Sequence, residues 1–217
     1  MKVKVCGMRE PENIAEVAAL GPDYLGFIFY AASPRFAGQP SLAEWLSEHH
    51  VKVAHPKRVG VFVNAEVDHL LNTVHDFQLD WVQLHGDESP GYCRELKLLW
   101  SVDTLRKAEL CKAFSITDDF DFRETNPYVE SCSMFVFDTG GKQTPGGTGQ
   151  QWNWDKLKEY SGPVPFLLSG GIGPDDVEAL KRLDHKQLRG VDVNSKFEIS
   201  PGVKDVEQLR TFIAAVH

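Results

Sequence analysis

The residues of this 217-residue chain that suit acid, base or anion-binding chemistry stand at the ends of short apolar runs. A thiol ends one run and a carboxylate ends another, while glycines, hydroxyls and amides follow the last two. If the runs are parallel strands of one sheet, their carboxyl ends meet and these groups come together. We expect the following residues to share one site: Cys6, Arg35, His85, Asp138, Gly170, Gly171, Asp192, Asn194 and Ser195.

Cys6 is the candidate general base. In the opening stretch MKVKVCGM, Val3 and Val5 alternate with Lys4 and Cys6, so a strand would place the last two on one face. A free thiol has a pKa of about 8.5, and a neighbouring ammonium lowers it toward a reactive thiolate. The alternative is a buried cysteine that serves only as a small hydrophobic residue.

Asp138 is the candidate general acid, because it ends the apolar run MFVFD. Burial there would raise its pKa and keep a proton available for donation. Its alternative role is to cap the loop that follows. That loop, TGGKQTPGGTGQ over residues 139–150, is the most glycine-rich part of the chain and is expected to be a mobile lid over the site.

Two segments near the end of the chain suit a phosphate group. The stretch SGGIGPDDV offers backbone amides from Gly170 and Gly171 before a helix opened by proline, and DVNS offers Asn194 and Ser195 beside it. Two ordinary glycine turns are the alternative. Arg35, in the sequence SPR, could bind a carboxylate with both arms of its guanidinium, or could be a solvated surface residue.

His85 in QLHGDE and Asp192 in GVDVNS carry less specific signals, since a polar residue at a strand end is often structural. We include both as substrate-binding candidates. The aromatic residues are expected to fill the core.

The elements that must position these groups alternate between β-rich runs and amphipathic segments. The eight predicted strands cover residues 3–7, 23–29, 58–63, 81–85, 111–116, 134–138, 165–171 and 189–195, and helical patterns cover 11–20, 41–50, 66–75, 88–96, 154–160, 174–183 and 205–216. Pro11 opens the first helix, and Ser41 with Glu44 suits a capping box for the second.

The mean spacing of roughly 27 residues per strand and helix is typical of a closed (β/α)8 TIM barrel, and no linker or repeat divides residues 1–217, so we expect a single domain. An open doubly wound sheet is the alternative, but the first strand is not followed by its glycine-rich G-x-G-x-x-G turn. The weakest regions are 98–110, where an extra strand, a longer helix or an insertion is possible, and 117–131, which makes a poor fifth helix.

Composition excludes several classes of protein. The net charge of −8 argues against a general binder of nucleic acid or anionic membranes, so an anionic substrate must be captured locally. We expect neither a secretion signal nor a membrane span, because no apolar stretch approaches the roughly 18 residues that a span requires. The four cysteines have no C-x-x-C or zinc-ligand spacing, which favours a cytoplasmic protein with no structural metal.

These motifs, in this order, resemble the phosphoribosylanthranilate isomerase family of tryptophan biosynthesis. The matching segments are KVCGMR, LGFIF with SPRF, VGVFVN, VQLHGDE, GGTG with WNWD, LSGGIGPDDV, and GVDVNS with PGVKD. The resemblance covers nearly the whole chain. It implies an Amadori rearrangement of N-(5-phosphoribosyl)anthranilate to the 1-amino-1-deoxyribulose 5-phosphate derivative, without metal or cofactor.

Carried over to this sequence, the resemblance implies that Cys6 is the base and Asp138 the acid. It implies that Arg35 contacts the anthranilate carboxylate, and that phosphate binds at Gly170, Gly171 and the amides of Asn194 and Ser195. The chemistry needs such a pair: the ring oxygen must gain a proton and the adjacent carbon must lose one.

One departure from the family pattern follows the eighth strand, where Lys196 replaces the usual glycine. Either this position does not need a positive φ, or the turn is rebuilt and the lysine adds charge near phosphate. Two other functions stay open: the related isomerase of histidine biosynthesis, which resembles this fold but looks as though it uses paired aspartates, and a non-catalytic phosphosugar sensor. The expected partner is a small phosphosugar, and a monomer or a homodimer is expected.

Overall fold

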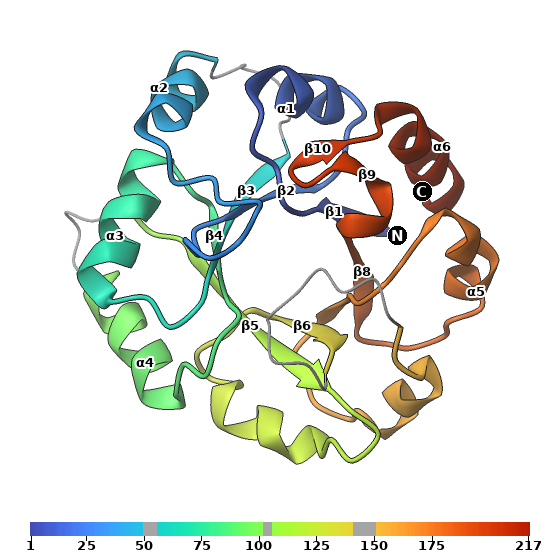
Figure 1. Cartoon of the computed structure of the whole chain (residues 1–217). Coiled ribbons are helices and arrows are strands. Elements are labelled where there is room, and N and C mark those ends of the chain that lie inside the picture. The colour runs from blue at the N-terminus through green and yellow to red at the C-terminus, as the bar shows by residue number, and fades with distance from the viewer. Residues whose placement is uncertain (50–55, 102–105, 141–150) are drawn as a thin grey trace.

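Eight parallel strands close into a barrel surrounded by helices (Figure 1). The structure is a computed structural model that describes residues 1–49, 56–101, 106–140 and 151–217. The strands pair in chain order, and β1 closes the ring against β8. They are β1 (Lys2–Val5), β2 (Tyr24–Ile28), β3 (Lys57–Phe62), β4 (Trp81–Leu84), β5 (Glu109–Ile116), β6 (Met134–Thr139), β7 (Phe166–Leu168) and β8 (Leu188–Val193). The predicted barrel is confirmed, and the open sheet is wrong.

The outer ring contains α-helices where the apolar stripes were strongest. These are α1 (Pro11–Ala18), α2 (Pro40–Glu48), α3 (Val67–Asp76), α4 (Pro90–Leu99), α5 (Val177–Lys181) and α6 (Val206–Val216). Proline opens α1, α2 and α4, where its missing N–H costs no hydrogen bond. The predicted capping box at Ser41 is wrong, because Pro40 already occupies the first turn and Gln39 is the N-cap, without a side-chain bond.

The predicted helices around residues 117–131 and 154–160 are instead 3₁₀ helices, η1 (Phe122–Tyr128) and η2 (Trp154–Glu159). Pro127 inside η1 lacks an N–H and prevents a regular α-helix there. Another short 3₁₀ helix, η3 (Pro174–Asp176), precedes α5. The chain therefore has its weakest helical cover on the side of β5, β6 and β7.

The chain between β8 and α6 contains elements that the sequence did not predict. A 3₁₀ turn, η4 (Ser195–Phe197), leads into an antiparallel hairpin of β9 (Glu198–Ser200) and β10 (Val203–Lys204). In Figure 1 this hairpin lies over the end of the barrel, beside the start of α1. Its position brings residues after the eighth strand close to the loops after the first two.

The barrel interior is divided along its axis. Near the amino ends of the strands it is filled by an apolar cluster: Tyr24, Val59, Trp81, Cys111, Ala113, Met134, Val136 and Leu167. Above it lie buried polar side chains that face the interior, among them Lys4, Gln83 and Asp192. The apolar cluster thus forms a dry floor under a polar layer.

Parts of two sequence predictions lie outside the described residues. The expected lid overlaps 141–150, and the ambiguous region 98–110 overlaps 102–105. The described part of the latter ends α4 at Leu99 and begins β5 at Glu109. Among the described residues, no helix is long and apolar enough to cross a membrane.

Candidate active site

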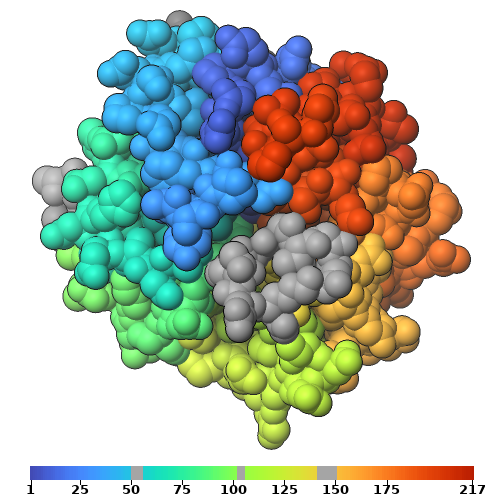
Figure 2. All heavy atoms as spheres, in the orientation of Figure 1, coloured from blue at the N-terminus to red at the C-terminus, as the bar shows by residue number. Residues whose placement is uncertain are grey.

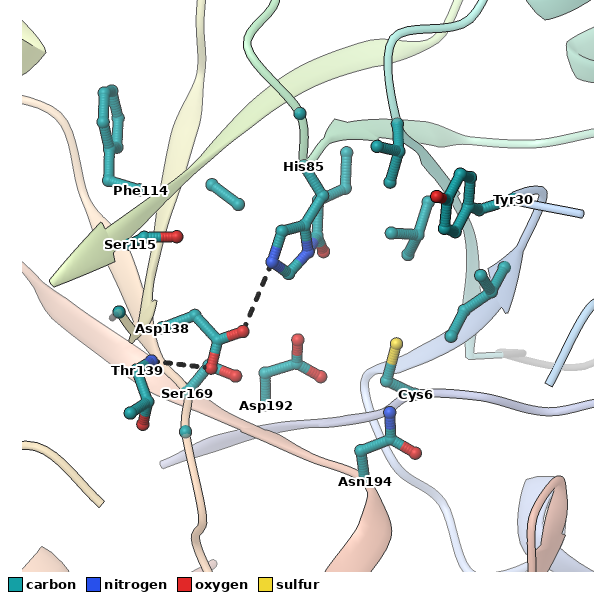
Figure 3. A pocket seen from close by; sticks show the side chains of 18 of the residues that line it. Cys6, Tyr30, His85, Phe114, Ser115, Asp138, Thr139, Ser169, Asp192 and Asn194 are labelled. Atoms are coloured by element: carbon teal, nitrogen blue, oxygen red, sulfur yellow. Dashed lines mark hydrogen bonds and ion pairs between the residues drawn. The ribbon is translucent and has the colours of Figure 1, made fainter. Parts of the chain in front are cut away.

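A cavity of about 680 Å³ opens at the carboxyl ends of the strands, on the face shown in Figure 2. Its volume lies in the range of small-molecule sites. The structure brings all nine candidate residues to its lining: Cys6, Arg35, His85, Asp138, Gly170, Gly171, Asp192, Asn194 and Ser195. In Figure 3, Cys6 and Asp138 lie on different sides of the cavity with Asp192 between them.

Cys6 follows β1 and is 6% exposed. Its amide donates to the carbonyl of Val193 on β8. Gly26 on the neighbouring strand makes room for it: a Cβ there would lie 2.8 Å from the Cys6 sulfur and 3.2 Å from Cε of Lys4. Both side chains therefore face the barrel interior, which confirms that they share a face of the strand.

The effect of Lys4 on the thiol is weaker than the sequence predicted. Burial raises the pKa of Cys6, and although the Lys4 ammonium lowers it, the pKa stays above the ordinary value. Burial is the largest cause, and Lys4 also has another partner, since its Nζ lies 2.7 Å from Oδ2 of the buried Asp192. Asp192 itself raises the pKa of the thiol. The predicted lowering of the Cys6 pKa is therefore wrong for the unliganded site.

Asp192 has one oxygen without a partner. Oδ2 accepts from Lys4, while Oδ1 is buried and has no hydrogen-bond partner in the part of the chain that the structure describes. Burial raises the pKa of Asp192 despite the opposing effect of Lys4. Since the residue lines the cavity, the free oxygen is available to a substrate hydroxyl or N–H.

Asp138 at the end of β6 pairs with His85 at the end of β4. Nε2 of His85 lies 3.3 Å from Oδ2 of Asp138, and the amide of Thr139 donates to Oδ1 at 2.9 Å (Figure 3). The other ring nitrogen of His85 lies 3.1 Å from Nε2 of Gln83. The histidine is thus held between two side chains of the barrel.

Burial tends to raise the pKa of Asp138. His85, the Thr139 amide and Ser169 together lower it by more than burial raises it, so the pKa lies below the ordinary carboxyl value. The predicted increase is wrong, because the sequence could not show that His85 would stand beside this carboxylate. In the unliganded site the aspartate is ionised and the thiol is protonated.

The phosphate candidates adopt backbone conformations that suit an anion site. Gly170 and Gly171 have φ of 97° and 66°, which favour glycine. A Cβ on Gly170 would also collide with Thr139. Lys196 does not have a positive φ and lines the cavity, so the family's glycine is not needed at this position for backbone reasons.

Arg35 reaches the cavity from the loop after β2. Its guanidinium is bound by Glu198 of β9, with Nη2 2.7 Å from Oε2. Arg35 is therefore a largely buried residue with a charged partner, and the alternative of a solvated surface residue is wrong. This partner was missed by the sequence analysis, although Glu198 lies between two of the quoted motifs.

Other lining residues were also missed. Lys112 on β5 donates to the carbonyls of Gly86 and Ala113 and lies 3.3 Å from the buried Glu88. A lysine inside an apolar strand is a signal that could have marked it. The aromatic residues are not all core filling, since Tyr30, Phe114, Phe120 and Tyr128 contribute to the cavity lining.

Among the described residues there is no group of three or more His, Cys, Asp or Glu side chains able to hold a metal ion. The chemistry available in the cavity is proton transfer between a thiol and a carboxylate, with a guanidinium and glycine-rich loops for anions.

Comparison with known proteins identifies relatives over the whole chain. The model of the family described as N-(5'-phosphoribosyl)anthranilate (PRA) isomerase matches residues 3–215. The N-(5'-phosphoribosyl)anthranilate isomerase of Parabacteroides distasonis is 42% identical over 216 residues, covering 100% of this chain and 93% of that protein.

Solved structures are similar in fold. The phosphoribosyl anthranilate isomerase of Thermus thermophilus is 26% identical with a TM-score of 0.81, covering 99% of this chain and 98% of that one. A phosphoribosyl anthranilate isomerase solved in complex with reduced 1-(o-carboxyphenylamino)-1-deoxyribulose 5-phosphate is 28% identical with a TM-score of 0.80, covering 100% and 98%.

Proposed function

We propose that this chain, which belongs to the N-(5'-phosphoribosyl)anthranilate isomerase family, catalyses the Amadori rearrangement of N-(5'-phosphoribosyl)anthranilate in tryptophan biosynthesis. The observation that carries the proposal is the placement of Cys6 and Asp138 around one cavity that also contains a guanidinium and two glycine loops. A base and an acid on different strands can act on neighbouring atoms of one bound sugar.

The first step is opening of the ribose ring. Asp138 gives a proton to the ring oxygen as the bond between that oxygen and C1 breaks, and the anilino nitrogen forms a C1=N iminium. Nε2 of His85, 3.3 Å from Oδ2 of Asp138, orients the carboxyl group for this step. In the second step the Cys6 thiolate takes the proton from C2, which gives an enolamine. Return of a proton to C1 and loss of the hydroxyl proton at C2 give the ketone, so no proton is gained or lost overall.

In the unliganded site Cys6 is protonated and Asp138 is ionised, which is the reverse of the protonation states that the two steps require. The reactive form, with a thiolate and a protonated carboxyl, is therefore a minor one. Binding of a substrate with two anionic ends raises the pKa of Asp138, since nearby negative charge disfavours its ionised form. The cationic iminium that follows stabilises the nearby thiolate of Cys6. Substrate and intermediate thus favour each catalytic group in the form it needs.

Recognition in this proposal uses both anionic ends of the substrate. Arg35 binds the anthranilate carboxylate, and the amides at Gly170, Gly171, Asn194 and Ser195 bind the phosphate. Lys196 adds positive charge at the same rim of the cavity. Such local capture suits a chain whose net charge is −8.

The test is turnover by the purified protein, followed as loss of anthranilate fluorescence from freshly made substrate. Cys6→Ser and Asp138→Asn should each lower kcat about a hundredfold or more, with little change in Tm, because both nearly preserve volume. Cys111→Ser is the matched control, since Cys111 is a buried cysteine of the apolar floor. Substrate binding without turnover in the native protein would favour the sensor and refute the enzyme. Full activity of Cys6→Ser would refute its role as base.

The proposal extends to the setting of the enzyme. It treats residues 1–217 as one domain, requires no cofactor because every step is a proton transfer, and places the protein in the cytoplasm. A solved relative from Thermotoga maritima is described as dimeric, and sedimentation of this protein would decide between a monomer and a homodimer.

A further inference from the structure

Glu198, the first residue of β9, binds three groups at once. Its carboxylate accepts from Nε and Nη2 of Arg35 at 2.7–3.0 Å, and Oε1 accepts from Nζ of Lys204 at 2.8 Å. The amide of Gly202 donates to the same oxygen at 3.1 Å. One carboxylate therefore joins the loop after β2 to both strands of the hairpin.

This cluster is buried although it lies near the mouth of the barrel. The exposed fractions of the side chains are 5% for Glu198, 0% for Lys204 and 12% for Arg35. Burial tends to raise the pKa of Glu198, but Arg35 and Lys204 together lower it by more than burial raises it. The carboxylate therefore stays ionised. Buried charged groups are costly to desolvate, and for stability alone an apolar cluster would serve as well.

The geometry leaves one side of the Arg35 guanidinium unused by Glu198. A guanidinium has five N–H groups, of which Glu198 takes the one on Nε and one on Nη2. One N–H on Nη1 and the second on Nη2 form another fork, which matches a carboxylate in bidentate geometry. Arg35 lines the cavity, so a bound ligand can reach this second fork.

The same carboxylate is connected to the phosphate end of the site. Nζ of Lys204 donates to Oδ1 of Asn194 at 2.8 Å and to its carbonyl at 3.3 Å. Asn194 directly precedes Ser195 in the loop after β8. In Figures 1 and 2 the orange-red hairpin lies beside the blue loop that follows β2, which agrees with these contacts.

We propose that Glu198 is a positioning residue, which fixes Arg35 by one fork so that the other fork meets the substrate carboxylate. The inference rests on the proposed function, since it takes an anthranilate carboxylate as the ligand of Arg35. Glu198 itself does not contact the reacting atoms.

The experiment compares two ligands by calorimetry. One is reduced 1-(o-carboxyphenylamino)-1-deoxyribulose 5-phosphate, and the other is the same compound without the ring carboxylate. Glu198→Gln should weaken binding of the first about tenfold or more and binding of the second by less than about threefold, because only the first uses the second fork of Arg35. In turnover, KM should rise more than kcat falls.

Glu207→Gln is the matched control, because Glu207 is an exposed residue that pairs with Arg210 in α6. It should leave both affinities unchanged. If Glu198→Gln does not fold, Glu198→Asp replaces it, because it keeps the charge beside Lys204 while the shorter side chain withdraws from Arg35. The preference for the ligand with the ring carboxylate should then fall, but by less than in Glu198→Gln.

Equal weakening for both ligands, or no weakening, would overturn the positioning role while leaving the isomerase proposal intact. Failure of the native protein to bind the carboxylated compound would overturn both.

Discussion

Replacing Lys4 by methionine tests the buried pair beneath the Cys6 thiol. The Lys4 ammonium lies 2.7 Å from Asp192, with exposed fractions of 1% and 6%. Methionine fills a similar space but removes the ammonium that Oδ2 of Asp192 accepts from. Among the described residues, the buried carboxylate is then left with no hydrogen-bond donor for either oxygen. Removing one partner of a buried pair costs about 3–5 kcal/mol. For a chain of this size, about 2–4 °C per kcal/mol gives a Tm lower by roughly 6–20 °C.

The loss should depend on pH with a defined sign. Burial already raises the pKa of Asp192, and loss of Lys4 raises it further. Where a folded carboxyl has a raised pKa, the folded state binds more protons than the unfolded state, so stability falls as pH rises through that window. The free energy of unfolding of the variant should therefore be closest to that of the native protein at acid pH. The difference should be largest at neutral pH and above.

The assay is thermal and urea unfolding, with refolding checked so that a midpoint has meaning. Lys2→Met is the matched control: it makes the same substitution on the same strand at an exposed residue and should change stability by no more than about 0.5 kcal/mol. Adding Asp192→Asn to the Lys4 variant should restore part of the loss, because no buried charge is then left alone. A Lys4→Met protein as stable as Lys2→Met, or a double variant no better than the single one, would refute this account.

Two further predictions concern the site itself. The profile of kcat/KM should be level across neutral pH, falling below the pKa of Asp138 and above that of Cys6, because the reactive minor form is a constant fraction between the two values. A tenfold rise per pH unit between about pH 6 and 8 would contradict these pKa directions. Gly26→Ala should lower kcat by displacing the Cys6 sulfur, since the new Cβ would lie 2.8 Å from it. Native kcat and native rates of thiol alkylation in that variant would show that the close approach does not matter.

The period of the strands explains why so much of the site could be predicted. Cys6, His85 and Asp138 each end an apolar run and Asp192 lies near the end of another, and the closed barrel brings such ends to one cavity. The alternation of MKVKVCGM also placed Lys4 and Cys6 on the same face correctly. These inferences need only local sequence and one rule of topology.

What the sequence could not predict depends on contacts between distant segments. The direction of the Asp138 pKa follows from His85, which follows another strand. That of Cys6 follows first from burial of the thiol and then from Asp192, which lies 188 residues from its partner Lys4. The hairpin of β9 and β10 is too short to give a periodic signal. Local rules also compete: Pro40 displaced the cap expected at Ser41.

The pairing of β1 with β8 also constrains the order of events during synthesis. The partner of Lys4, Asp192, is synthesised 188 residues later, and Val193, whose carbonyl accepts from the amide of Cys6, follows it directly. At about 5–20 residues per second the ribosome takes roughly 10–40 s to deliver these partners. Throughout that interval the edge of the first strand that pairs with β8 has no partner, and a thiol lies at the end of the strand. Because an unpaired strand edge can pair with another chain, we expect the nascent protein to be most open to aggregation before its last strand is made.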